Sequence, residues 1–200
     1  MEQLLRFVLP IYLIIYCLVA FVWRSFVVRK RTGINPVTFS RSDNAHDCVG
    51  RMFMLVFLLI AVVVLVYSFA PSLYTFATPI VWLERTWLKW TGLALLALSL
   101  AWTVTAQAQM GLSWRVGIDE VHKTNLVETG VFRRSRNPIF SGMIVTLLGF
   151  FLTIPNAATL LVLGVGFAAI QIQVRLEEEF LLRTHGEKYV DYQRRVRRWL

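Results

Sequence analysis

Five apolar segments dominate this sequence and limit what it can fold into. They span residues 4–22, 52–70, 88–108, 139–153 and 157–174. Their only charged residues are Arg6 and Lys89, each near the end of a segment. Most of the segments have the length that a helix needs to cross a bilayer, about 20 residues. Because the apolar residues are continuous rather than alternating, they exclude an outer-membrane barrel. We therefore expect an all-α, polytopic membrane protein with about five transmembrane helices.

The last two apolar segments are expected to form a hairpin, because only the turn around Pro155-Asn156 separates them. No small-residue cleavage site follows the first segment, and Arg29-Lys30-Arg31 lies behind it. We therefore interpret that segment as a retained anchor rather than a signal peptide. The chain has 200 residues and no internal repeat, so one membrane-embedded domain is expected over residues 1–200.

Basic residues are distributed very unevenly between the loops. Of the 21 Lys and Arg residues, 18 lie within residues 23–51, 109–138 and 175–200. Basic loops stay on the cytoplasmic side, so we expect the N-terminus outside and the C-terminus in the cytoplasm, in the inner (cytoplasmic) membrane. The same distribution explains the net charge of +9 without a nucleic-acid partner, and membrane lipids are the expected surroundings.

The chain after the fifth segment is amphipathic. Tyr189, Tyr192, Val196 and Trp199 recur at spacings of three, four and three, with arginines between them. We expect a C-terminal amphipathic helix. Two interpretations are open for it: a helix lying on anionic lipid, or a helix whose Tyr189 also contacts a ligand.

A polar cluster, Arg136-Asn137-Pro138, stands directly before the fourth segment. Proline favours the first helical turn, so Arg136 and Asn137 are expected beside the positive end of that helix. This end suits an anionic group such as a carboxylate. The alternative is a simple helix cap with an arginine reaching the membrane surface.

A second polar cluster, Glu177-Glu178-Glu179, follows the fifth segment. Surface salt bridges with Arg175 and Arg183 are one interpretation. The other is binding of a ligand with vicinal hydroxyls or a positive charge, since a carboxylate accepts hydrogen bonds from both. A sulfonium cofactor offers such groups. No Cys/His spacing resembles a metal site.

Three motifs together resemble a known group of membrane enzymes. They are Leu126-Val127-x-x-Gly130-Val131-Phe132, then Arg136-Asn137-Pro138-Ile139-Phe140-x-Gly142, and finally Glu177-Glu178-x-x-Leu181-x(4)-Gly186-x-x-Tyr189-x-x-Tyr192. Their order and spacing resemble the isoprenylcysteine carboxyl methyltransferase and phospholipid methyltransferase superfamily. The resemblance covers roughly residues 110–200 and includes the cytoplasmic loop, which would form a lid or wall.

The resemblance implies S-adenosylmethionine as cofactor, with no Rossmann domain. It assigns cofactor contacts to the loop before the fourth helix, the turn that opens it and the glutamates. Carried over, these contacts are Leu126, Val127, Phe132, Asn137, Pro138, Ile139, Phe140 and Glu177, with Glu178 and Tyr189 added. Arg136 and Asn137 are the expected catalytic residues.

The sequence departs from the family pattern at positions that matter for chemistry. Asn137 replaces the usual histidine; it can donate a hydrogen bond but cannot titrate. Gln173 stands where the carboxyl methyltransferases carry the arginine that holds the substrate carboxylate. The nearest arginine, Arg175, lies on another helix face. We assign Gln173 and Arg175 to the substrate side and expect poor methylation of a prenylcysteine carboxylate.

The expected function is methyl transfer to a lipophilic or lipidated acceptor: a prenylcysteine carboxylate, a lipid amine or a thiol. Two alternatives remain open. A membrane reductase of the sterol reductase type resembles the same fold with NADPH as cofactor, and a small membrane scaffold would have no chemistry. Binding of S-adenosylhomocysteine or of NADPH separates the three.

Overall fold

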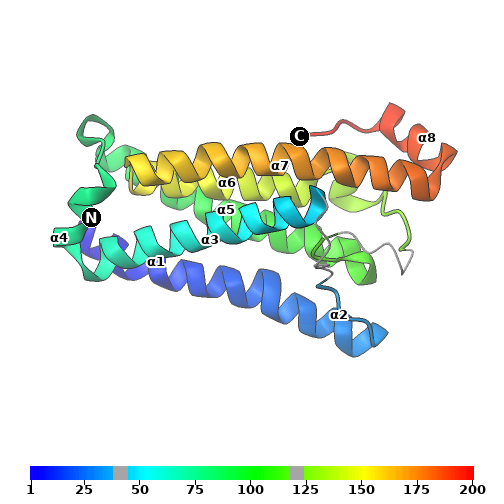
Figure 1. Cartoon of the computed structure of the whole chain (residues 1–200), viewed down its shortest axis with the longest axis horizontal. Helices are drawn as coiled ribbons and strands as arrows, with labels where there is room; N and C mark the ends of the chain where they lie inside the picture. The colour runs from blue at the N-terminus through cyan, green and yellow to red at the C-terminus, as the bar shows by residue number, and fades with distance from the viewer. Residues whose placement is uncertain (38–44, 118–123) are drawn as a thin grey trace.

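A computed structural model describes residues 1–37, 45–117 and 124–200 of this chain. It shows a bundle of long helices lying side by side (Figure 1). The elements of the bundle are α1 (Glu2–Cys17), the π-helix η1 (Leu18–Trp23), α2 (Arg24–Thr32), α3 (Ala45–Phe69), α5 (Thr86–Met110), α6 (Pro138–Thr153) and α7 (Ala157–His185). The shorter elements are α4 (Pro71–Tyr74), η2 (Thr75–Ala77), η3 (Val81–Leu83), η4 (Gly111–Ser113), η5 (Gly130–Arg133) and α8 (Glu187–Arg195).

The expected all-α membrane fold is confirmed. In the described part of the chain, four helical segments are long and apolar enough to cross a membrane, namely 2–32, 45–69, 86–113 and 157–185. Helix α6 is apolar but has only 16 residues. α1, η1 and α2 together form one continuous rod, so the bundle contains the five expected helices.

Two predicted boundaries are wrong. The first apolar segment was expected to end at residue 22, but the helix continues to Thr32 and ends at Gly33, whose φ of 71° suits glycine. The fifth helix was expected to end near residue 174, but α7 continues to His185. Glutamate, leucine and arginine favour helix, and nothing breaks the run before Gly186. The glutamates therefore lie inside α7 rather than behind it.

Helices α5 and α6 approach each other closely because glycines line their contact. A Cβ atom on Gly142 would lie 2.3 Å from the Thr103 hydroxyl, and one on Gly92 would lie 2.8 Å from the Gly149 carbonyl. Small residues permit this approach between membrane helices. A buried hydrogen bond from Thr146 Oγ1 to Ser99 Oγ, 2.9 Å long, adds to the contact.

The predicted hairpin of α6 and α7 turns at Asn156, which is fully buried. Its side chain accepts a hydrogen bond from the backbone N–H of Thr159, and the Thr159 hydroxyl accepts one from the N–H of Asn156. Asn156 Nδ2 also donates to the Tyr74 hydroxyl at 3.1 Å. This capping box begins α7 and ties the turn to α4.

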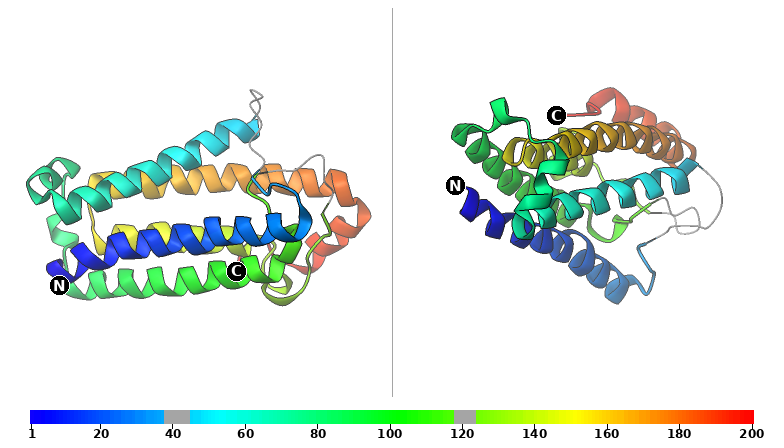
Figure 2. Two further views of the ribbon diagram at one scale, coloured as in Figure 1. Left: turned by 90° about the horizontal axis from the view of Figure 1, so that it is seen from below. Right: turned by 60° about the vertical axis from the view of Figure 1, so that its left-hand side comes forward.

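Helices α1 and α3 touch at only one end of the bundle. Leu5 and Leu9 of α1 pack in a core cluster with Val63, Val64 and Tyr67 of α3. Toward the other end, which carries α2 and α8, the two helices diverge (Figures 1 and 2). The divergence leaves space between them for a cavity.

Candidate functional site

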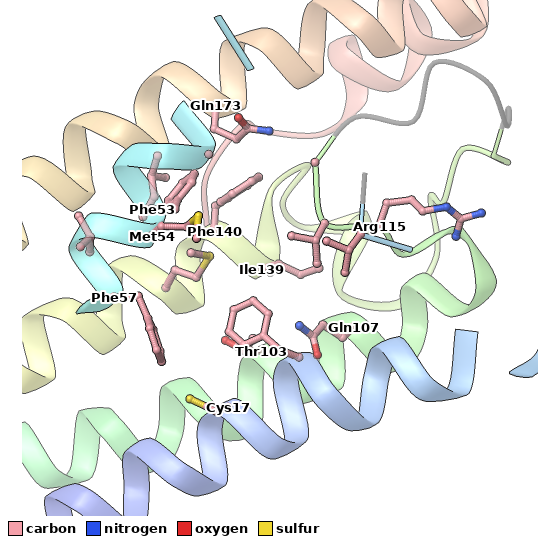
Figure 3. A pocket seen from close by; sticks show the side chains of 18 of the residues that line it. Cys17, Phe53, Met54, Phe57, Thr103, Gln107, Arg115, Ile139, Phe140 and Gln173 are labelled. Atoms are coloured by element: carbon pink, nitrogen blue, oxygen red, sulfur yellow. The ribbon is translucent and has the colours of Figure 1, made fainter. Parts of the chain in front are cut away.

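A cavity of about 1270 Å³ lies between the helices where α1 and α3 diverge. Side chains from α1, η1, α3, α5, α6 and α7 line it, and Figure 3 shows them converging on one space. The apolar part of its wall is formed by Leu13, Phe53, Phe57, Ile60, Met143, Leu147 and Phe150, among others. Such a wall suits a hydrocarbon chain.

The cavity opens toward the outer surface of the bundle between η1 and α3. Four lining residues of these two elements are also exposed: Phe21 at 37% and Val22 at 58% on η1, and Met54 at 66% and Phe57 at 41% on α3. In a membrane this surface faces lipid. A lipophilic molecule therefore has a sideways route into the cavity.

The end of the cavity near α8 is polar. Gln173 and Glu177, one turn apart on α7, line it, and Gln173 Nε2 donates to Glu177 Oε1 at 2.9 Å. Across from them, the chain after α2 meets the chain after α5, where the N–H of Val116 donates to the Pro36 carbonyl at 2.8 Å. This contact closes the polar end with backbone from two loops, and Arg115 adds a side chain to the wall.

Four of the predicted site residues line this cavity: Ile139, Phe140, Gln173 and Glu177. Ile139 and Phe140 lie in the first turn of α6, and Figure 3 shows both side chains directed at the same space as Gln173. The structure thus brings together the proline turn and the first glutamate, which are about forty residues apart in the sequence.

Arg136, Asn137 and Glu178 form a second cluster beside the cavity. The buried carboxylate of Glu178 accepts hydrogen bonds from Arg136 Nη2 at 2.9 Å and from Asn137 Nδ2 at 3.3 Å. Arg198 from the C-terminal tail completes the cluster, with Nη2 at 2.7 Å from the second carboxylate oxygen. The hydrogen bonding of Arg198 to Glu178 raises the pKa of Arg198 above its usual value.

The same cluster binds the C-terminal tail to the turn before α6. Arg136 Nη1 donates to the carbonyls of Val196 at 2.5 Å and Gln193 at 3.2 Å, and the Arg136 N–H donates to the Arg197 carbonyl at 2.9 Å. The Ser135 hydroxyl donates to the Arg198 carbonyl. Arg136 therefore caps the end of α8 and pairs with Glu178 at the same time.

Helix α8 is amphipathic as predicted, but its apolar face lies on protein rather than on lipid. Tyr189 and Tyr192 are 1% and 2% exposed and form a cluster with Val196, Leu126 and Leu181. Burial, with a smaller contribution from the charge of Glu178, raises the pKa of Tyr189 to about 12. The helix ends at Arg195 because the tail turns back to the Arg136 cluster, so Trp199 does not continue its face.

The remaining predicted residues support these two regions. Pro138 begins α6, and its carbonyl accepts a hydrogen bond from Trp102 Nε1 at 2.8 Å. Phe132 is buried in η5, with its carbonyl 2.6 Å from the Tyr192 hydroxyl. Val127 is half-buried. Arg175 is exposed and donates to the Gln171 carbonyl at 2.8 Å, outside the cavity lining.

Polar residues inside two apolar segments were missed by the sequence analysis. Thr103 and Gln107 of α5 are buried and line the cavity, as does Thr146 of α6. A polar side chain within a membrane helix is a signal of function or helix contact. That signal was present in the sequence at Gln107.

Comparison with known proteins supplies one match. A family model described as phospholipid methyltransferase matches residues 87–188, about half of the chain. A search of curated proteins finds no significant match. The matched region runs from the start of α5 to the start of α8 and includes the four predicted residues that line the cavity.

Proposed function

This chain belongs to the phospholipid methyltransferase family, and on that premise we propose that it transfers a methyl group from S-adenosylmethionine to a lipophilic acceptor in the membrane. The observation that carries the proposal is the cavity, which combines a polar end at Glu177 with an opening toward lipid. A water-soluble donor and a lipophilic acceptor need such a space, because each must reach the same point from a different phase.

The size of the cavity supports two ligands. Sites for one drug-sized molecule measure about 300–1,000 Å³, whereas this cavity measures about 1270 Å³. We assign the polar end to the cofactor and the apolar part to the acceptor.

The residues at the polar end fit the cofactor. The Glu177 carboxylate accepts hydrogen bonds from vicinal ribose hydroxyls or from an ammonium group, and Gln173 orients it at 2.9 Å. Ile139 and Phe140 offer apolar surface beside it. S-adenosylmethionine supplies a methyl group on a positive sulfur.

Arg136, Asn137 and Glu178 take a positioning role in this proposal, since they hold the turn that begins α6. The remaining predicted cofactor contacts stay predictions: Leu126, Val127, Phe132, Asn137, Pro138, Glu178 and Tyr189. The predicted catalytic role of Arg136 and Asn137 also stays a prediction.

The protein contributes alignment and exclusion of water. Methyl transfer is accelerated when acceptor and donor are held in line in a site without bulk solvent. The apolar walls from α1, α3 and α6 exclude water from the acceptor side, while the loops that close the polar end shield the donor side.

The charges on the cavity wall favour an acceptor without a fixed negative charge. Apart from His46, Arg115 is the basic residue among the described lining residues, and it is opposed by Asp47 and Glu177. Gln173 supplies no charge to neutralise a carboxylate, and an unpaired buried carboxylate costs several kcal/mol. A lipid amine or a lipophilic thiol therefore fits better than a prenylcysteine carboxylate.

A comparison of acceptors on the wild type and on Gln173→Arg tests this preference. We expect poor methylation of prenylcysteine analogues by the wild type and a gain with the added arginine. Efficient prenylcysteine methylation by the wild type, with no gain from Gln173→Arg, would show that the argument from charge is wrong.

We place the polar end of the cavity on the cytoplasmic side of the membrane. The loops at this end of the bundle belong to the three regions that hold 18 of the 21 basic residues. The cofactor is made in the cytoplasm, so this orientation gives it direct access.

The cofactor assignment is tested by calorimetry with S-adenosylhomocysteine and NADPH on purified protein. We expect binding of the first and none of the second. Glu177→Gln should weaken S-adenosylhomocysteine binding by about 1.5–3 kcal/mol, the scale of a lost charged hydrogen bond. Glu179→Gln is the matched control, because Glu179 is the exposed neighbour outside the cavity lining. Unchanged affinity in folded Glu177→Gln would reject the assignment.

A further inference from the structure

The first membrane helix changes its hydrogen-bond pattern partway along its length. Between α1 and α2, residues Leu18–Trp23 form the π-helix η1. Short π-helical turns within α-helices are rare and frequently lie at functional sites. The family match begins at residue 87 and assigns nothing to this segment.

One buried side chain of α5 holds η1 in place. Gln107 Nε2 donates to the carbonyl oxygen of Ala20 at 3.0 Å, and the two residues are 4% and 0% exposed. An amide in apolar surroundings is costly unless it is hydrogen-bonded. The hydrogen bond therefore couples the position of η1 to that of α5. The position of α5 is fixed in turn by its close contact with α6.

The segment held by Gln107 is also a wall of the cavity. Cys17, Phe21 and Val22 line the cavity from this side, and Phe21 and Val22 also border its opening toward lipid. Figure 3 shows Cys17 and Gln107 on two neighbouring helices, both beside the cavity. The distance between η1 and α3 decides how wide the opening is, and Gln107 holds one side of it.

We propose that the Gln107–Ala20 hydrogen bond and η1 set the width of the lipid-side opening and thereby select the hydrocarbon chain of the acceptor. Gln107 is a positioning residue, which acts through the backbone of η1. This inference takes the molecule that enters the opening, a long-chain lipid acceptor, from the proposed function. The geometry of the opening does not depend on the methyl donor.

The native thiol of Cys17 provides a direct readout of the opening. Cys48→Ser removes the other of the two cysteines in the sequence. The protein in lipid nanodiscs is then labelled with a small N-alkyl maleimide and with a bulky one, and the ratio of the two rates reports the width. Gln107→Met keeps the side-chain length and removes the donor. We expect it to raise the bulky-to-small ratio about fivefold, the factor that loss of one hydrogen bond implies.

Two further variants keep the test decisive. Thr105→Val, on the exposed face of α5, removes a polar group outside the cavity lining and should leave the ratio unchanged. Phe21→Ala widens the same wall from η1 at a partly exposed position that the fold should tolerate, and it should raise the ratio as well. If Gln107→Met does not fold, Phe21→Ala decides the outcome.

Acceptor selectivity gives the second readout. Acceptors whose hydrocarbon chains differ in bulk should have more similar KM values in Gln107→Met than in the wild type. The affinity for S-adenosylhomocysteine should stay at the wild-type value. An unchanged labelling ratio in folded Gln107→Met and Phe21→Ala, or an unchanged spread of KM values across the acceptors, overturns the proposal. Absence of S-adenosylhomocysteine binding in the wild type would instead reject the proposed function alone, since labelling of Cys17 needs no methyl donor.

Discussion

Replacing Glu178 by glutamine removes the negative charge that joins α7, the turn before α6 and the C-terminal tail. Glu178 is 6% exposed, and the side chain of Arg136 beside it is 10% exposed. Arg198, which reaches Glu178 from the tail, is 38% exposed. The substitution leaves the Arg136 guanidinium buried without a countercharge, whereas Arg198 can turn to solvent.

The expected loss of stability follows from this difference in burial. Breaking a buried ion pair by removing one partner costs about 3–5 kcal/mol. Arg198→Gln should cost less, about 1–2 kcal/mol, because the arginine is partly solvated and its loss removes hydrogen bonds to a charged group. In the Glu178→Gln background, Arg198→Gln should add less than about 0.5 kcal/mol, because its partner is already neutral.

Thermal unfolding of the purified protein measures these changes. For a chain of this size, 1 kcal/mol corresponds to about 2–4 °C, so Glu178→Gln should lower Tm by about 6–20 °C. Glu179→Gln, one residue along α7 and exposed, is the matched control and should change Tm very little. Binding of S-adenosylhomocysteine is measured on the same samples.

Two results would refute this reasoning. Additive losses in the double variant would show that Glu178 and Arg198 do not act as a pair. A Glu178→Gln protein with wild-type Tm that no longer binds S-adenosylhomocysteine would assign Glu178 to the cofactor rather than to the tail.

Two further predictions concern packing and orientation. Gly92→Ala should destabilise the protein by about 1–3 kcal/mol, because the new Cβ would lie 2.3 Å from the Thr153 hydroxyl. Gly164→Ala is the control and should be neutral or slightly stabilising, because no atom lies within 4 Å of its new Cβ. Equal Tm values for the two variants would contradict the packing of α5 against α6. In a cysteine-free background, Thr75→Cys should react with an impermeant thiol reagent applied outside intact cells and Glu187→Cys should not; labelling of Glu187→Cys from outside would reverse the proposed topology.

Most of the fold could be predicted from the sequence because membrane helices are specified locally. Each long apolar run must form its own backbone hydrogen bonds in lipid, so its length and composition already indicate a helix. The turn at Asn156 could be predicted for the same reason, because Pro155-Asn156 interrupts the helix at its own position in the sequence. The boundaries at Thr32 and His185 were not, because polar residues that leave the membrane can continue a helix as well as end it.

The candidate site was predicted in part. Motif spacing indicated Ile139, Phe140, Gln173 and Glu177, and these four residues line one cavity. The assignment of neighbouring Glu178 to the cofactor could not be checked from spacing. On a helix, successive residues point about 100° apart, so Glu177 faces the cavity while Glu178 faces Arg136 and the tail.

The sequence by itself determined the class of fold, the helix order and the division of basic charge between the loops, because each depends on residues close together in the chain. Only the tertiary structure decided where the cavity lies and what lines it. The divergence of α1 from α3, the bond from Gln107 to Ala20 and the contact of Arg198 with Glu178 join residues distant in the sequence. Such contacts depend on how whole helices pack, which no local pattern of residues specifies.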